Sequence, residues 1–192
     1  EYAKILGASL SYMLIKNQDA VGFYAFDSKV KKVIQPKSTK GHLSSLLKEM
    51  EKIKAGNKTN IAQAIHECAD KTHKKGLVIV ISDLMDDEKK ILTGLKHLLY
   101  KGHEVIVFHI LDSKEINFDF NDRVKFIDLE SNDTIIADSR QLKKIYRKKI
   151  ERFIDFYRQS CFKKKIDYVN LMTSQSLDTA LSEYIIKRKK LH

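Results

Sequence analysis

Apolar residues along the chain follow two patterns, which together predict alternating helices and strands. In some segments they recur every three or four residues, as on one face of a helix, and in others they form short continuous runs typical of buried strands. The predicted helices are 1–16, 39–53, one capped by Asn60, one from Asp86 or Asp87 to Gly102, 139–165 and 176–187. The predicted strands are 20–26, 30–35, 76–82, 104–111, a hairpin of 124–129 with 134–137, and 167–171.

Strands that alternate with helices predict an α/β fold, with a mostly parallel sheet and helices on both faces, in a single domain over residues 1–192. The run 20–26 is apolar nearly throughout, so we expect a strand buried on both faces. The more polar run 30–35 predicts an antiparallel edge strand that stops at Pro36. Ligands of such sheets bind beyond the carboxyl ends of the strands.

The helix period also predicts which side chains face the core. Inward positions are Leu43, Leu46, Leu47 and Met50 in the second helix, and Ile61, Ala64, Ile65 and Cys68 in the third. The long helix from Ser139 should bury Leu142, Ile145, Tyr146, Ile150, Phe153 and Tyr157. Its outward residues should be Lys143, Lys144, Arg147, Lys148 and Arg152.

Composition narrows the class of protein. The chain has 192 residues, of which 43% are hydrophobic and 32% charged, as in a folded globular domain. No apolar run approaches the ~20 residues that span a bilayer, and the first helix carries acid and lysine, unlike a signal peptide. The two cysteines lie far apart and form no Cys-x-x-Cys motif, which favours free thiols in a reducing cytoplasm.

The positive charge is concentrated in one segment. Of the formal net charge of +11, the residues from Arg140 onward contribute 15 Lys and Arg against 5 Asp and Glu. A basic helix face is usually a solvated surface, but it also leaves open a nucleic-acid-binding function through phosphate contacts. No stacking or base-reading motif accompanies it.

Enzyme signatures are not found in the sequence. There is no Gly-rich phosphate loop, no Gly-x-Ser-x-Gly elbow and no His-Glu-x-x-His zinc motif. An aspartyl phosphatase loop would need a second acid at position 85, where the chain has Met85. We therefore predict a protein that is not an enzyme.

Several segments resemble the bacterial family catalogued as domain of unknown function fifty-eight, whose members contain a von Willebrand factor A-like fold. The resemblance covers nearly the whole chain, from DAVGFYAFD through GLVIVISDLMDD to the ending IDYVNLMTS…ALSEYI. GHEVIVFHILDSKE is among its most specific segments, although Ser113 replaces the proline that is usual there.

The resemblance implies a Mg²⁺ site at the carboxyl edge of the sheet, in a module that binds a protein partner. The implied ligands are Thr59, in Asn57-Lys58-Thr59-Asn60, and Asp83, which follows the strand 76–82. The Asp-x-Ser-x-Ser motif of the family's first strand would precede Glu1, so we interpret the chain as a fragment with an incomplete metal site. By the family's topology that strand lies between 20–26 and 76–82, which should then be ~10 Å apart and not hydrogen-bonded to each other. The resemblance also implies a MoxR-type AAA+ ATPase as partner.

Other polar residues have simpler interpretations. Thr59 alone is more often a loop or cap residue, and Asp83 alone has even odds of marking a site. Asp86, Asp87 and Glu88 fit a helix cap with first-turn acids better than a metal cluster. His103 and His109 lie at or within a strand and are expected to be structural.

Overall fold

The computed structural model describes residues 1–27, 30–53, 60–113, 123–127, 134–178 and 181–182. Its helices are α1 (Tyr2–Lys16), α2 (Lys40–Lys52), α3 (Ile61–Lys71), α4 (Glu88–Tyr100) and α6 (Ser139–Phe162). Its strands are β1 (Val21–Phe26), β2 (Val30–Lys37), β3 (Leu77–Ser82), β4 (Glu104–Leu111), β5 (Arg123–Ile127), β6 (Thr134–Asp138) and β7 (Asp167–Met172). The predicted helix 176–187 lies largely outside the described residues.

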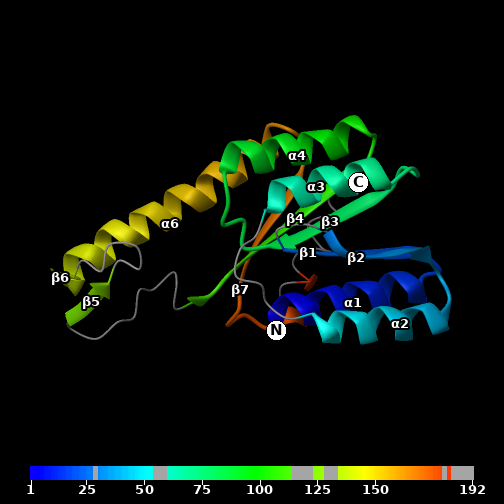
Figure 1. Cartoon of the computed structure of the whole chain (residues 1–192), viewed down its shortest axis with the longest axis horizontal. Helices are drawn as coiled ribbons and strands as arrows, with labels where there is room; N and C mark the ends of the chain where they lie inside the picture. Colours follow the sequence, from blue (N-terminus) through cyan, green and yellow to red (C-terminus); the bar gives the residue numbers. More distant parts are fainter. Residues whose placement is uncertain (28–29, 54–59, 114–122, 128–133, 179–180, 183–192) are drawn as a thin grey trace. The chain divides into compact units, whose positions relative to one another are not determined.

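The order of elements confirms the predicted α/β class (Figure 1). β3 and β4 pair in parallel, in continuous register from Leu77 with Glu104 to Ser82 with His109. β1 and β2 pair antiparallel, as do β5 and β6, so the predicted antiparallel direction of β2 and the predicted hairpin of β5 with β6 are confirmed. The chain divides into two compact units, Glu1–His109 and Ile110–His192.

Within the first unit, helices lie on both sides of the β1–β2 pair. α1 and α2 lie side by side below it in Figure 1, and α3 and α4 lie together above it. Buried Ile15 of α1 packs with Leu46 and Met50 of α2, and half-buried apolar residues of β1 and β2 complete this cluster. Apolar burial of this kind contributes about 1.5–3 kcal/mol for each large side chain.

The prediction that β1 and β3 are not hydrogen-bonded to each other is confirmed for the described residues. In the described part of the chain, β1 pairs with β2 and β3 pairs with β4, and no ladder joins β1 to β3. Helix α1 contacts both strands. A Cβ on Gly7 of α1 would lie 3.8 Å from Cδ1 of Ile81 and 3.7 Å from the terminal methyl of Met50, so the helix rests directly on β3 and α2 there.

Burial differs between the three apolar strands. β4 is buried from Val105 to Leu111, so the side chains on both of its faces are covered. The prediction that β1 is buried on both faces is wrong, because Ala25 is its only buried residue. Likewise only Val80 of β3 is buried. β1 pairs with β2 alone among the described residues, which leaves its other edge without a strand neighbour there.

Pro36 does not end β2, which continues to Lys37, so that prediction is also wrong. The register between β1 and β2 shifts between Val21 and Phe23, a β-bulge opposite this proline. Pro36 is tolerated because β2 is an edge strand, where a lost amide donor costs little. Gly22 makes the close approach possible: a Cβ there would lie 2.9 Å from Cγ of Pro36 and 3.0 Å from the carbonyl oxygen of Ile34.

Most of the predicted helix faces are confirmed. Ile61, Ala64 and Ile65 of α3 and Ile150 and Tyr157 of α6 are buried. Two residues were placed wrongly: Leu47 is 38% exposed and Ile145 is 58% exposed. In α2, His42 is buried together with Leu46 and Met50, and its Nε2 lies 2.7 Å from the carbonyl oxygen of Val21, which links the helix to β1.

The outward face of α6 agrees with the prediction at four of five positions, since Lys143 is half-buried rather than exposed. Tyr146 and Phe153 are half-buried, and the side chain of Leu142 lies outside the described residues. No helix in the described part of the chain is both long enough and apolar enough to cross a bilayer.

We predict that Gly22→Ala lowers the free energy of unfolding by about 1–3 kcal/mol, because the new Cβ overlaps the rigid ring of Pro36 and a backbone oxygen. Gly41→Ala is the matched control. A Cβ on Gly41 meets no atom within 4 Å, and alanine in a helix raises stability by up to ~1 kcal/mol. Urea unfolding followed by circular dichroism measures both variants, and equal effects would contradict this account of Gly22.

Candidate functional site

The loop after β3 presents Asp83 at the carboxyl end of the strand. Its side chain is exposed, and Oδ1 accepts hydrogen bonds from the backbone N–H of Met85 at 3.2 Å and from the hydroxyl of Ser82 at 3.4 Å. Among the described residues, no lysine or arginine forms an ion pair with Asp83. The carboxylate is therefore both fixed in direction and accessible.

Leu84 gives this loop its shape. Its φ is +55°, in the left-handed region that a leucine rarely adopts and that costs about 1–3 kcal/mol. The side chain of Leu84 is fully buried, and its N–H donates to the hydroxyl of Ser82 at 3.1 Å. Burial of the side chain offsets the backbone strain, and the reversal of the chain leaves Asp83 facing solvent.

A buried histidine in β4 also fixes the same loop, through a hydrogen bond. His109 of β4 has no exposed surface, and its Nε2 lies 2.9 Å from the carbonyl oxygen of Asp83. Because the carbonyl can only accept, this nitrogen carries the proton and donates it. Burial lowers the pKa of His109 to about 4, despite the opposing effects of that hydrogen bond and of the Asp83 charge.

The three acids that follow divide into two roles. Asp87 is the N-cap of α4 and accepts from the backbone N–H groups of Lys89 and Lys90, and Glu88 lies in the first turn, as predicted. Asp86 acts on a different helix. Its Oδ2 accepts from the backbone N–H of Ile61 at 3.0 Å, so the loop after β3 caps the start of α3.

The end of β1 is also connected to the start of α3, next to the loop after β3. The N–H of Asn60 donates to the carbonyl oxygen of Asp27, at the end of β1, at 2.9 Å. Asp27 forms an ion pair with Lys31. The end of β1, the start of α3 and the loop after β3 are thus linked by hydrogen bonds.

Of the two residues predicted as metal ligands, the structure describes only Asp83; Thr59 lies outside the described residues, next to Asn60. Among the described residues no three His, Cys, Asp or Glu side chains converge on one point. Asp27 is engaged by Lys31 and Asp86 by the α3 backbone. The described residues alone therefore do not fit a Mg²⁺ ion, which prefers near-octahedral oxygen coordination.

The sequence analysis did not predict that Asp27 lies near the candidate site, or that Asp86 caps α3. A signal existed for Asp27: like Asp83, it directly follows an apolar strand. No local signal indicated that Asp86 caps a helix that precedes it by 25 residues. His103 is buried, as expected of a structural residue, and neither of its ring nitrogens has a hydrogen-bond partner among the described residues.

Comparison with known proteins identifies the family. Residues 1–154 match the family described as Protein of unknown function DUF58. The chain belongs to the DUF58 family. No curated protein matches this DUF58 chain.

Two solved structures are similar to this DUF58 chain. One is the conserved hypothetical protein BatB from Bacteroides thetaiotaomicron, at 20% identity and a TM-score of 0.56, covering 98% of this chain and 87% of that one. The other is an aerotolerance-related membrane protein from Bacteroides fragilis with multiple mutations to serines, at 17% identity and a TM-score of 0.51, covering 96% and 88%. These likenesses support the fold.

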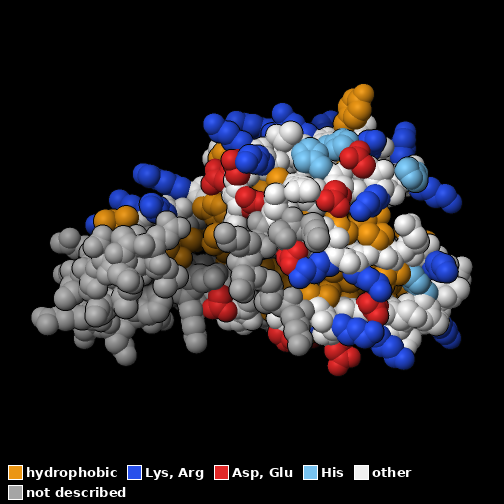
Figure 2. All heavy atoms as spheres, in the orientation of Figure 1, with side chains coloured by type: hydrophobic (Ala, Val, Ile, Leu, Met, Phe, Trp, Pro, Cys, Tyr) orange, Lys and Arg blue, Asp and Glu red, His pale blue; other side chains and the backbone are white. Residues whose placement is uncertain are grey.

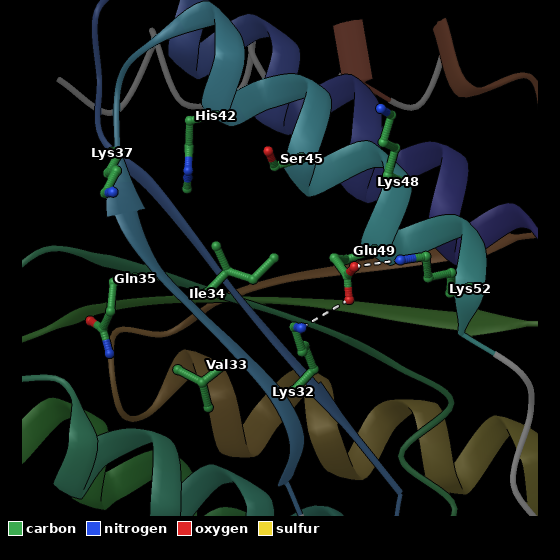
Figure 3. A pocket seen from close by; sticks show the side chains of 10 residues that line it. All are labelled: Lys32, Val33, Ile34, Gln35, Lys37, His42, Ser45, Lys48, Glu49 and Lys52. Carbon is green, nitrogen blue, oxygen red and sulfur yellow. Dashed lines mark hydrogen bonds and ion pairs between the residues drawn. The ribbon is translucent and has the colours of Figure 1, made fainter.

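The DUF58 chain also has an open groove of about 500 Å³ between β2 and α2 (Figure 3). Its lining carries the lysines Lys32, Lys37, Lys48 and Lys52. In Figure 3, Glu49 lies between Lys32 and Lys52, and hydrogen bonds from these two lysines lower the pKa of its carboxyl group. The ion pairs of Glu49 neutralise part of the positive charge of the groove. We therefore regard the groove as a weaker candidate for a binding site than the Asp83 loop.

The basic face of α6 is the other candidate surface. Lys144, Arg147, Lys148 and Arg152 are all exposed, and Figure 2 shows Lys and Arg side chains over this helix. Arg158 pairs with Asp155 one turn further along. The face offers positive charge to an acidic partner but no stacking platform among the described residues.

We predict that His109 makes the DUF58 chain lose stability as pH falls from about 6.5 to about 4. The pKa of this residue lies below 6.5 in the folded chain, so the unfolded chain takes up the proton first. The loss should be on the order of 3 kcal/mol and complete near pH 4. His109→Gln keeps a donor without this titration and should flatten that part of the curve, whereas His73→Gln, at an exposed position, should not. Urea midpoints from pH 7.5 to 4 provide the measurement.

Proposed function

We propose that this chain is a non-enzymatic protein-binding module that binds its partner at the carboxyl edge of the sheet, through Asp83. The observation that carries the proposal is an exposed carboxylate on a loop that cannot easily move. The hydrogen bond from His109 links that loop to β4, the cap that Asp86 provides links it to α3, and the side chain of Leu84 is buried. A preorganised charged group binds with less loss of entropy than a mobile one.

A divalent cation is the second part of the proposal. Asp83 is the single described side chain at this edge that is both exposed and available as a hard oxygen ligand. Mg²⁺ would be held there together with Thr59 and with an Asp-x-Ser-x-Ser motif in a chain that carries one ahead of Glu1. When bound, the ion would let a carboxylate of the partner complete its coordination shell.

The partner class follows from the family resemblance. We propose a MoxR-type AAA+ ATPase, contacted in the cytoplasm. One similar structure is named an aerotolerance-related membrane protein, and by analogy we propose a role near a membrane for this chain as well. The basic face of α6 would speed encounter with an acidic partner without giving specificity.

We predict that Asp83→Asn weakens binding to a purified MoxR-type ATPase from the same organism by at least tenfold, ~1.4 kcal/mol. Asparagine keeps the Oδ1 acceptor for the N–H of Met85, so the turn remains and only the charge is lost. Asp19→Asn removes the same charge from an exposed turn after α1 and serves as the control. Calorimetry with nuclease-treated proteins measures both, and equal affinity for the two variants would reject the role of Asp83.

The exposed basic face of α6 supports a second candidate function, nucleic-acid binding. We predict that replacing Lys144, Arg147 and Lys148 by Glu leaves the fold intact, at about 0.5 kcal/mol or less for each exposed position. Binding to random duplex DNA should be weak, salt-sensitive and independent of sequence. Fluorescence anisotropy at several salt concentrations measures it, and replacing Lys89, Lys90 and Lys96 of α4 by Glu gives a control with equal charge. Tight binding to one sequence at physiological salt, abolished only by the α6 changes, would favour this function over the adaptor.

A further inference from the structure

Two histidines from neighbouring helices meet on the first unit, away from the Asp83 loop. Nδ1 of His66 in α3 lies 3.0 Å from Nδ1 of His97 in α4, and the ring centroids are 5.2 Å apart at an interplanar angle of 43°. Figure 2 shows histidine side chains at the surface over these two helices. His66 is half-buried and the side chain of His97 is 23% exposed, so ions in solution can reach the pair.

Close packing of the two helices brings the rings together. Gly94 of α4 faces Ile65 of α3, and a Cβ on this glycine would lie 3.1 Å from Cγ2 of Ile65 and 3.3 Å from the carbonyl oxygen of Ala62. Those distances are tighter than ordinary contacts, so the absent side chain sets the helix separation. His66 follows Ile65, and His97 lies almost one turn after Gly94, beside this closest point.

A carboxylate lies at the far side of one ring. Oδ1 of Asp70, one turn after His66 on α3, is 3.6 Å from Nε2 of His97. The same oxygen is 3.7 Å from Nζ of Lys101. A carboxylate next to Nε2 favours the proton on that nitrogen, so that Nδ1 of His97 presents its lone pair to His66.

We propose that His66 and His97 form a two-imidazole site for a late first-row divalent cation such as Zn²⁺, Ni²⁺ or Cu²⁺, with Asp70 as a positioning residue. Imidazole nitrogens bind such ions at about 2.0–2.1 Å, which places two tetrahedral ligands roughly 3.3 Å apart. The 3.0 Å separation of the two Nδ1 atoms needs to open by only a few tenths of an ångström. Water fills the remaining positions, since no third His, Cys, Asp or Glu converges among the described residues.

The protons balance without net release. In the metal-free chain one Nδ1 donates to the other. In the proposed arrangement the proton on Nε2 of His97, on the side of Asp70, makes His97 the acceptor and His66 the donor. On binding, the Nδ1 proton of His66 leaves and its Nε2 takes up a proton from water. Both rings then stay neutral, with both Nδ1 lone pairs on the metal and both Nε2 atoms protonated.

The site has a structural consequence that does not depend on the proposed partner. A cation held by one ligand from α3 and one from α4 links two helices that already pack together. Because the unfolded chain does not hold the two histidines at this distance, bound metal raises the melting temperature as its concentration rises. Mg²⁺, which prefers oxygen ligands, should not do so through this pair.

Calorimetric titration of the untagged chain with ZnCl₂, NiCl₂ and CuCl₂ tests the proposal. We expect one ion per chain, with Cu²⁺ bound most tightly, and no comparable binding of MgCl₂. His66→Gln and His97→Gln should each abolish this binding, whereas the exposed His73→Gln and the sheet-edge Asp83→Asn should retain it. Asp70→Asn should weaken it about tenfold.

A second measurement on the unmodified chain does not depend on whether the variants fold. Two-bond ¹H–¹⁵N correlation spectra of the imidazoles should show Zn²⁺ shifting Nδ1 of His66 and His97, with both Nε2 atoms protonated. Asp70→Asn should increase the fraction of His97 protonated at Nδ1 in the metal-free chain, a change that a purely structural role would not cause. Coordination through Nε2, or binding that survives both histidine changes, would overturn the proposal.

Discussion

The hydrogen bond between Nε2 of His109 and the carbonyl oxygen of Asp83 is the interaction on which the candidate site depends. It connects β4, which is buried from Val105 to Leu111, to the end of its parallel neighbour β3. A neutral, fully desolvated imidazole satisfies a backbone oxygen that the ladder leaves without a partner at the strand end. The position of Leu84, and through Asp86 the start of α3, follow from where that oxygen is held.

Periodicity was sufficient to predict the strands and helices of this chain because most of them carry an unambiguous pattern. β4 is apolar at nearly every position and is buried at nearly every position. The errors arose where burial depends on neighbours distant in sequence. Ile145 fits the apolar stripe of α6 and Leu47 that of α2, yet both are exposed. His42 of α2 is polar but buried, because its ring reaches a carbonyl oxygen of β1. A helical wheel contains no information on where the adjacent strand presents an acceptor.

The site was predicted less completely than the fold. Asp83 could be found because an acid directly after an apolar strand is visible in the sequence. Asp86 and the His66–His97 pair depend on contacts across 25 and 31 residues of sequence. The packing of α3 against α4 and against the loop after β3 determines which residues these side chains contact. Local sequence spacing alone could therefore not predict these contacts.

The composition of β2 has a consequence for how this protein behaves at high concentration. A strand that pairs on one side only can act as a template for the strands of other copies, which is a common route to aggregation. β2 carries exposed Lys31, Lys32 and Lys37, and Pro36 lacks the amide proton that a continuing ladder would need. Two copies aligned along this strand would bring like charges together and lose a hydrogen bond. The edge thus discourages self-association, even though its neighbour β1 is strongly apolar.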